Sequence, residues 1–115
     1  ATLEVDLHLA PGKEKNVRFN KLPKGAVLAV RVRTDGPLAV LLVAAAELRN
    51  AQPQAMFRGS VERSISFQVE IPATGDYLLV LDNRRGTTAV EAHATLQARR
   101  PGKFPPKPPP GESRT

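Results

Sequence analysis

The sequence contains no cysteine and no tryptophan, and aromatic residues make up only 4% of its 115 residues. The lack of cysteine excludes disulfide bonds, thiolate chemistry and cysteine-ligated zinc sites. Because aromatic side chains are so few, a folded core has to be built from Leu, Val, Ile and Ala. Hydrophobic residues make up 41% of the chain, which is enough for the modest core of one domain.

A long hydrophobic run is also missing. The longest apolar run has nine residues, from Leu38 to Ala46, whereas a membrane-spanning helix needs about 20. The sequence therefore predicts no membrane span. It opens on the small residue Ala1 and enters a strand pattern at once, which fits both a processed secretory protein and an excised piece of a longer chain. We take a periplasmic or secreted location as the expectation.

Alternation of apolar and polar residues is clearest between Ser64 and Ala98. Such alternation places one set of side chains on a buried face and the other in water, as in a half-buried β-strand. Turn signals rich in Gly, Pro, Asp and Asn separate further short strands about every 8–12 residues, which is typical of a sandwich or barrel. We predict an all-β, jelly-roll-like antiparallel β-sandwich of seven or eight strands over residues 1–98.

The composition changes from Arg99 onward. Residues 99–115 carry five basic residues, one acidic residue and six of the eleven prolines. Consecutive prolines favour the extended polyproline II conformation, so we predict a disordered, basic, proline-rich tail or linker. The tail also supplies most of the net charge of +6, because residues 1–98 carry twelve basic and ten acidic residues.

This charge distribution indicates which class of molecule the protein binds. Nucleic-acid binding needs basic residues clustered on a folded face with aromatic residues among them. The nearly balanced charge of residues 1–98 does not provide this, so we predict no nucleic-acid partner. We expect a protein partner or a neighbouring domain, and the sequence does not define the oligomeric state.

The segment from Phe67 to Leu96 resembles a known family. It contains an alternating strand (FQVEIP), a Gly-Asp turn, the strand YLLVLDN and a last alternating strand. This order resembles the closing half of GOLD-like β-sandwich domains, known from the p24 secretory cargo proteins, and is similar to bacterial pre-peptidase C-terminal domains. The matching residues are Gly75, Tyr77, Leu79, Leu81, Asp82 and Asn83.

The resemblance implies a β-sandwich accessory or binding module without a catalytic residue. The chain departs from p24 proteins because it has no cysteine pair, coiled coil or membrane span. It also lacks the clustered acidic residues that would support a calcium site in some bacterial relatives.

Two pairs of arginines are candidate binding residues. Arg84 and Arg85 follow Asp82-Asn83 in the most polar loop of the sequence, and a plain turn would not require two arginines. Their guanidinium groups could bind a carboxylate or phosphate. Arg31 and Arg33 fall on the outward phase of a predicted strand and form the second candidate pair.

The two histidines are candidate metal ligands. His8 and His93 both fall on the outward phase of their strands, and Asp6 and Glu91 precede them by two residues. If the first and last strands pair, two imidazoles and a carboxylate could form a surface metal site. A pair of solvated histidines beside acidic side chains explains the same pattern. A metal-binding domain is therefore the alternative to a protein-binding module.

No catalytic site is predicted. A nucleophile–histidine–acid set could be assembled on paper from Ser64 or Ser66, His93 and Asp82. The sequence offers neither a nucleophile elbow nor a Gly-rich oxyanion loop to order these residues. We therefore predict a non-enzymatic protein that requires no cofactor.

Overall fold

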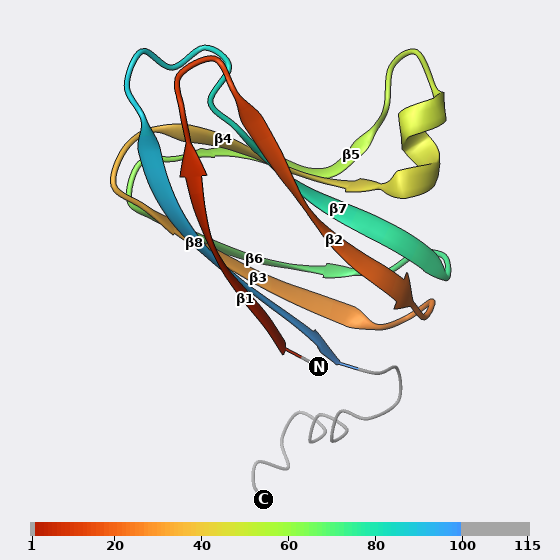
Figure 1. Cartoon of the computed structure of the whole chain (residues 1–115). Helices are drawn as coiled ribbons and strands as arrows, with labels where there is room; N and C mark the ends of the chain where they lie inside the picture. Colours follow the sequence, from red (N-terminus) through yellow and green to blue (C-terminus); the bar gives the residue numbers. More distant parts are fainter. Residues whose placement is uncertain (1, 100–115) are drawn as a thin grey trace, which may run out of the picture.

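The computed structural model describes residues 2–99, which fold into two β-sheets packed face to face (Figure 1). Within this part of the chain there are eight strands and one short 3₁₀ helix, η1 (Ala45–Arg49). The strands are β1 (Thr2–Leu9), β2 (Glu14–Leu22), β3 (Val27–Thr34), β4 (Leu38–Ala44), β5 (Ala55–Val61), β6 (Ser64–Glu70), β7 (Gly75–Asp82) and β8 (Val90–Arg99). The predicted all-β fold and strand number are confirmed. Strand β8 runs one residue past the predicted end of the domain, and the predicted tail from residue 100 lies outside the described residues.

The strands form two four-stranded antiparallel sheets with the order β1-β8-β3-β6 and β2-β7-β4-β5. Apart from β4 and β5, which pair with each other, consecutive strands of the described chain lie in different sheets, as in a jelly roll. The first strand pairs with the last along the whole length of β1, from Thr2 opposite Gln97 to Leu9 opposite Val90. This pairing is the one on which the predicted histidine cluster depended.

The core lies between the sheets and is almost entirely aliphatic. The largest fully buried side chains are Leu9, Leu28, Leu42, Ile71, Leu79, Leu81 and Leu96. They belong to the apolar phase of the alternating strands, as the sequence pattern predicts. Aromatic residues contribute Tyr77, which is buried, and a stacked pair, Phe57 and Phe67, whose ring centroids lie 3.7 Å apart. That pair joins the edge strands β5 and β6 at one open side of the sandwich.

The continuous apolar run of β4 is covered on both faces at only one end. Its Val43 faces away from the core, opposite Leu78 of β7, yet both are only 5% exposed. The helix η1 contacts both strands at this end and accounts for their burial. At the other end of β4, Ala39 and Leu41 on the outer face are only half-buried. An aliphatic strip therefore remains partly open to solvent there.

Candidate functional site: an arginine-lined hollow

The loop between β7 and β8, which carries Arg84 and Arg85, is fixed by the buried side chain of Asn83. Asn83 is 3% exposed, and its Nδ2 donates hydrogen bonds to the carbonyl oxygens of Leu9 at 3.0 Å and Thr88 at 2.9 Å. The backbone of Asn83 also pairs with the β1–β2 turn: its N–H donates to the Lys13 carbonyl at 2.8 Å, and its carbonyl accepts from the Gly12 N–H at 3.0 Å. Asn83 therefore joins the two turns at one end of the sandwich, where Figure 1 shows them side by side.

Gly86 completes this loop by leaving space for Asn83. Its N–H donates to the Asn83 carbonyl at 3.0 Å, which closes a tight turn around the two arginines. A Cβ at Gly86 would collide with the side-chain amide of Asn83. Glycine is thus required here by close approach, and the turn holds Arg84 and Arg85 at its exposed tip.

Arg84 and Arg85 line one wall of a hollow of about 600 Å³ on the outer face of the β2-β7-β4-β5 sheet. The half-buried Ala39 and Leu41 of β4 form part of its lining, and Arg58 of β5 stands on the side away from the loop. The remaining lining residues are Pro37, Leu38, Gly59, Ser60, Asp82, Asn83 and Gly86. Aliphatic groups and three guanidinium groups thus meet in one open concavity.

The three arginines are not equivalent. The Asp82 carboxylate accepts hydrogen bonds from Arg84 Nε and Nη2, both at 3.0 Å, and Glu14 Oε2 lies 3.8 Å from Arg84 Nε. These contacts fix Arg84 and partly neutralise it. The hydrogen bonds from the guanidinium hold the pKa of Asp82 below its ordinary value, and Asp82 in turn raises the pKa of Arg84. Within residues 2–99, neither Arg58 nor Arg85 forms an ion pair.

The hollow therefore has a net positive charge, from three arginines and one aspartate, beside an aliphatic patch. It can accept a carboxylate at Arg58 or Arg85 and a short apolar side chain over Leu41. Among the arginines that line the hollow, Arg84 and Arg85 are candidates from the sequence, whereas Arg58 is not. No local signal marks Arg58, because its place opposite Leu41 is set by the register of β4 and β5.

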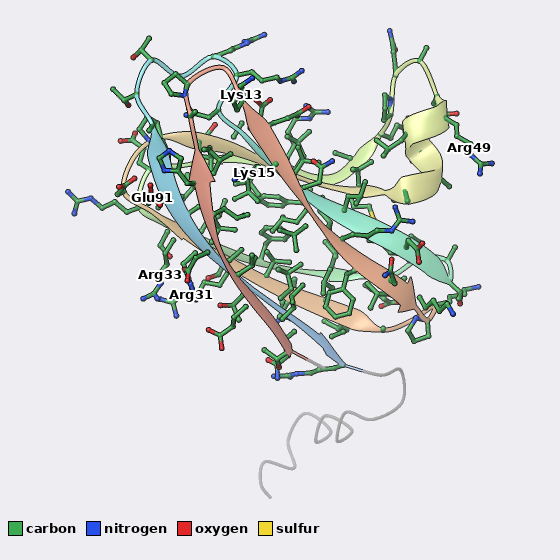
Figure 2. The ribbon with its side chains drawn as sticks, in the orientation of Figure 1. Lys13, Lys15, Arg31, Arg33, Arg49 and Glu91 are labelled. Atoms are coloured by element: carbon green, nitrogen blue, oxygen red, sulfur yellow. The ribbon has the colours of Figure 1, made fainter. Side chains whose placement is uncertain are left out.

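The other predicted pair, Arg31 and Arg33, lies on the opposite sheet. Both project from the outer face of β3, and Figure 2 shows them close together and far from Arg49 of η1. The four predicted binding arginines therefore form two separate sites. Arg31 lines a shallow hollow over β3, β6 and β8, while Arg33 lies opposite His93.

His93 is held between carboxylates of the neighbouring strand β1. Its Nδ1 lies 2.6 Å from Asp6 Oδ1, and its Nε2 lies 3.2 Å from Glu4 Oε1. Both ring nitrogens can donate to these acceptors only when the imidazole is protonated. The hydrogen bond to Asp6 accordingly raises the pKa of His93, while Arg33 opposes this.

His8 contacts the Glu91 carboxylate directly across the β1–β8 ladder. Because the first and last strands pair, the histidines are diagonal neighbours, and each lies directly opposite an acidic residue. However, no three His, Asp or Glu residues in the described part of the chain are grouped so that they could hold a metal ion. The metal site at His8 and His93 stays a prediction, for which the geometry offers only histidine–carboxylate pairs.

The residues considered for a nucleophile–histidine–acid set do not meet. Asp82 lies on the β2-β7-β4-β5 sheet, whereas His93, Ser64 and Ser66 lie on the other sheet. His93 and Ser64 share a row of that sheet, but Arg33 lies between them.

None of the helical structure found over residues 2–99 is long and apolar enough to cross a membrane.

Comparisons with known proteins show a similarity to solved structures but none in sequence. No family model matches the sequence, and no curated protein matches it significantly. The GOLD-like resemblance therefore stays a prediction. Among solved structures, the chain is similar to PliG of Aeromonas hydrophila, a periplasmic lysozyme inhibitor of g-type lysozyme, with a TM-score of 0.68 and 15% identity over 85% of this chain and 86% of PliG.

Two further structures show the same architecture. A CBM4 protein has a TM-score of 0.57 and 11% identity over 84% of this chain and 71% of that one. A de novo designed double-stranded β-helix has a TM-score of 0.53 and 17% identity over 83% of this chain and 99% of the design. At such low identity these matches show the fold, and the protein is a β-sandwich of the kind found in PliG.

Proposed function

We propose that this protein is a non-catalytic protein-binding module that acts outside the cytoplasm and binds an acidic segment of its partner in the arginine-lined hollow. The observation that carries this proposal is the pair of guanidinium groups, Arg58 and Arg85, that face the hollow without an ion pair among residues 2–99. A partner that supplies carboxylates there gains charge-assisted hydrogen bonds, and neither arginine has to give up an ion pair with residues 2–99.

The shape of the hollow supports an extended peptide segment. Half-buried Ala39 and Leu41 offer an aliphatic surface between Arg58 on β5 and the β7–β8 loop. In an extended segment, every second side chain points to the same face, so an acidic, an apolar and an acidic residue at positions i, i+2 and i+4 would all point into the hollow. Loops at one end of a rigid sandwich are also where such modules commonly place their contacts.

The likeness to PliG supports the class of partner and the location. PliG is a periplasmic protein whose partner is another protein, a g-type lysozyme. By this likeness, we propose that the present protein also binds a protein partner and is located in the periplasm or outside the cell. A g-type lysozyme is the first candidate partner to test.

The experiment that tests the hollow uses a fluorescently labelled Glu-Leu peptide, in which Glu and Leu take turns at every second position with Ser between them (Glu-Ser-Leu-Ser-Glu). The matched control, the Lys-Leu peptide, has Lys in place of each Glu. Anisotropy should show saturable binding of the Glu-Leu peptide that weakens as salt is added. Arg58→Glu and Arg85→Glu should each weaken this binding by about tenfold. Arg31→Glu, on the opposite sheet, should leave it unchanged. Equal binding of the two peptides, or equal loss in all three variants, would show that the hollow is not the site.

A second experiment addresses the partner. Excess protein is added to a g-type lysozyme, and lysis of bacterial cells is followed by turbidity. Inhibition that is lost in Arg85→Glu and kept in Arg31→Glu would identify the lysozyme as a partner of the hollow. Undiminished lysis together with peptide binding would reject the lysozyme and keep the hollow.

A further inference from the structure

Strand β6 is an exposed edge of its sheet. It pairs with β3 on one side, and no described strand pairs with its other side. Its side chains alternate strictly: Ile65, Phe67 and Val69 are half-buried against the core, and the outward row is Ser64, Ser66, Gln68 and Glu70. An edge of this kind presents free backbone hydrogen-bonding groups to another strand.

The other three edge strands carry features that discourage such pairing. Strand β2 bears Lys15 and Lys21, and its ladder is broken by a bulge at which Lys21 has a φ of 55°. Strand β5 has an irregular register opposite Val43 and carries Arg58. Strand β1 bears acidic side chains at Glu4 and Asp6. Strand β6 has a regular ladder and no charge before Glu70, so it lacks these defences.

We propose that β6 pairs with β6 of a second copy of this chain across a two-fold axis, which joins the two sheets into one of eight strands. An antiparallel pair centred on Phe67 uses all seven residues of the strand. It places Ser64 opposite Glu70 of the second copy, Ile65 opposite its Val69, and Ser66 opposite its Gln68. Apolar residues thus meet apolar residues on the core face, and polar residues meet polar ones outside.

Charge complementarity favours this register. Arg33 lies directly opposite Ser64 in the β3–β6 ladder. In the paired dimer, Arg33, Ser64 and Glu70 of the second copy fall in one row, with Arg33 and Glu70 two strand spacings, or about 9.6 Å, apart at their Cα atoms. The short serine between them leaves room for the guanidinium and carboxylate to meet.

Neither Arg33 nor Glu70 forms an ion pair within the described part of the chain, so both are available to the second copy. The two-fold axis creates the contact twice. A shift of the centre from Phe67 to Ser66 would instead set Glu70 opposite Glu62 of the second copy, where like charges repel.

The expected dimer is weak and reversible. Pairing one seven-residue edge buries less surface than the roughly 1,200–2,000 Å² of a typical stable interface. Dimerisation should therefore depend on concentration. It is also independent of the arginine-lined hollow, which lies on the other sheet.

Sedimentation equilibrium of the full chain over a wide concentration range tests the proposal. The average mass should rise from that of one chain towards twice that value. Glu70→Arg and Arg33→Glu should each raise the dissociation constant by about tenfold, because each creates a like-charge contact twice. The double variant with Glu70→Arg and Arg33→Glu should recover the wild-type dissociation constant. The double variant with Glu70→Arg and Arg31→Glu should not. Lys15→Glu, on the β2 edge, should behave as wild type.

Hydrogen exchange of the wild-type amides provides a readout that needs no variant. Exchange in β6 should slow as the protein concentration rises, while exchange in the β1 edge stays constant. A chain that remains monomeric at every concentration would overturn the proposal. A dimer that is unaffected by Glu70→Arg, or rescued through Arg31 rather than Arg33, would equally overturn the pairing described here.

Discussion

Replacing Asn83 by alanine should destabilise the whole domain, although Asn83 lies in a loop. The side chain is 3% exposed, and its Nδ2 donates to the carbonyls of Leu9 and Thr88. Leu9 is fully buried, so its carbonyl would lose the amide hydrogen bond without access to water, which costs about 1–3 kcal/mol. Thr88 is exposed, so its carbonyl can turn to water, and that bond is worth about 1 kcal/mol.

The expected loss for Asn83→Ala is therefore about 2–4 kcal/mol, out of a typical stability of about 5–15 kcal/mol. Urea unfolding followed by far-ultraviolet circular dichroism measures it, because the chain contains no tryptophan for fluorescence. The near-isosteric Asn83→Asp should be worse at neutral pH, since it sets a buried carboxylate against carbonyl oxygens. A loss below about 0.5 kcal/mol for Asn83→Ala would refute the role assigned to the amide.

Further predictions concern the same loop, the core, the β1–β8 ladder and η1. Gly86→Ala should destabilise the domain and lower peptide binding together, because its Cβ collides with Asn83; unchanged unfolding in urea would contradict this. Leu79→Ala, which truncates a fully buried side chain, should cost about 2–5 kcal/mol in the same assay. Histidine resonances followed by NMR should show His93 titrating above its ordinary pKa near 6.5. Since the folded-state pKa is raised, His93 stabilises the fold below about pH 6.5 and loses this effect as pH rises through the folded pKa. Asp6→Asn should lower the pKa of His93, because the hydrogen bond to Asp6 is the largest cause of the shift. Leu48→Ser, in η1, should change stability by less than about 0.5 kcal/mol, because Leu48 is 52% exposed.

The sequence predicts most of the fold because alternation is a local signal. The strands over Ser64–Glu70 and Val90–Arg99 appear where apolar and polar residues alternate. The pairing of the first and last strands, which the sequence left as a condition, is present. The Ala, Leu, Glu and Arg of Ala45–Arg49 favour helix, in keeping with the short helix η1 that follows β4. What local pattern does not reveal is that η1 covers Val43 and Leu78 on the outer face of the sheet.

The candidate site was only partly predictable for a similar reason. Arg84 and Arg85 are conspicuous in a turn that does not require them. Arg58 joins them only because β4 and β5 pair in a register that brings it beside Leu41. The distribution of the four predicted arginines between two faces likewise follows from which strands share a sheet, and this depends on contacts far apart in the sequence.

The central claim is that the arginine-lined hollow binds an acidic segment, and NMR mapping with isotope-labelled protein tests it most directly. Titration with the Glu-Leu peptide should shift the backbone amides of Leu41, Arg58, Arg85 and Gly86, which surround the hollow. The amide resonances of Arg31 and Arg33, on the opposite sheet, should not shift. Shifts confined to Arg31 and Arg33, or no shifts at a peptide concentration well above that of the protein, would contradict the account.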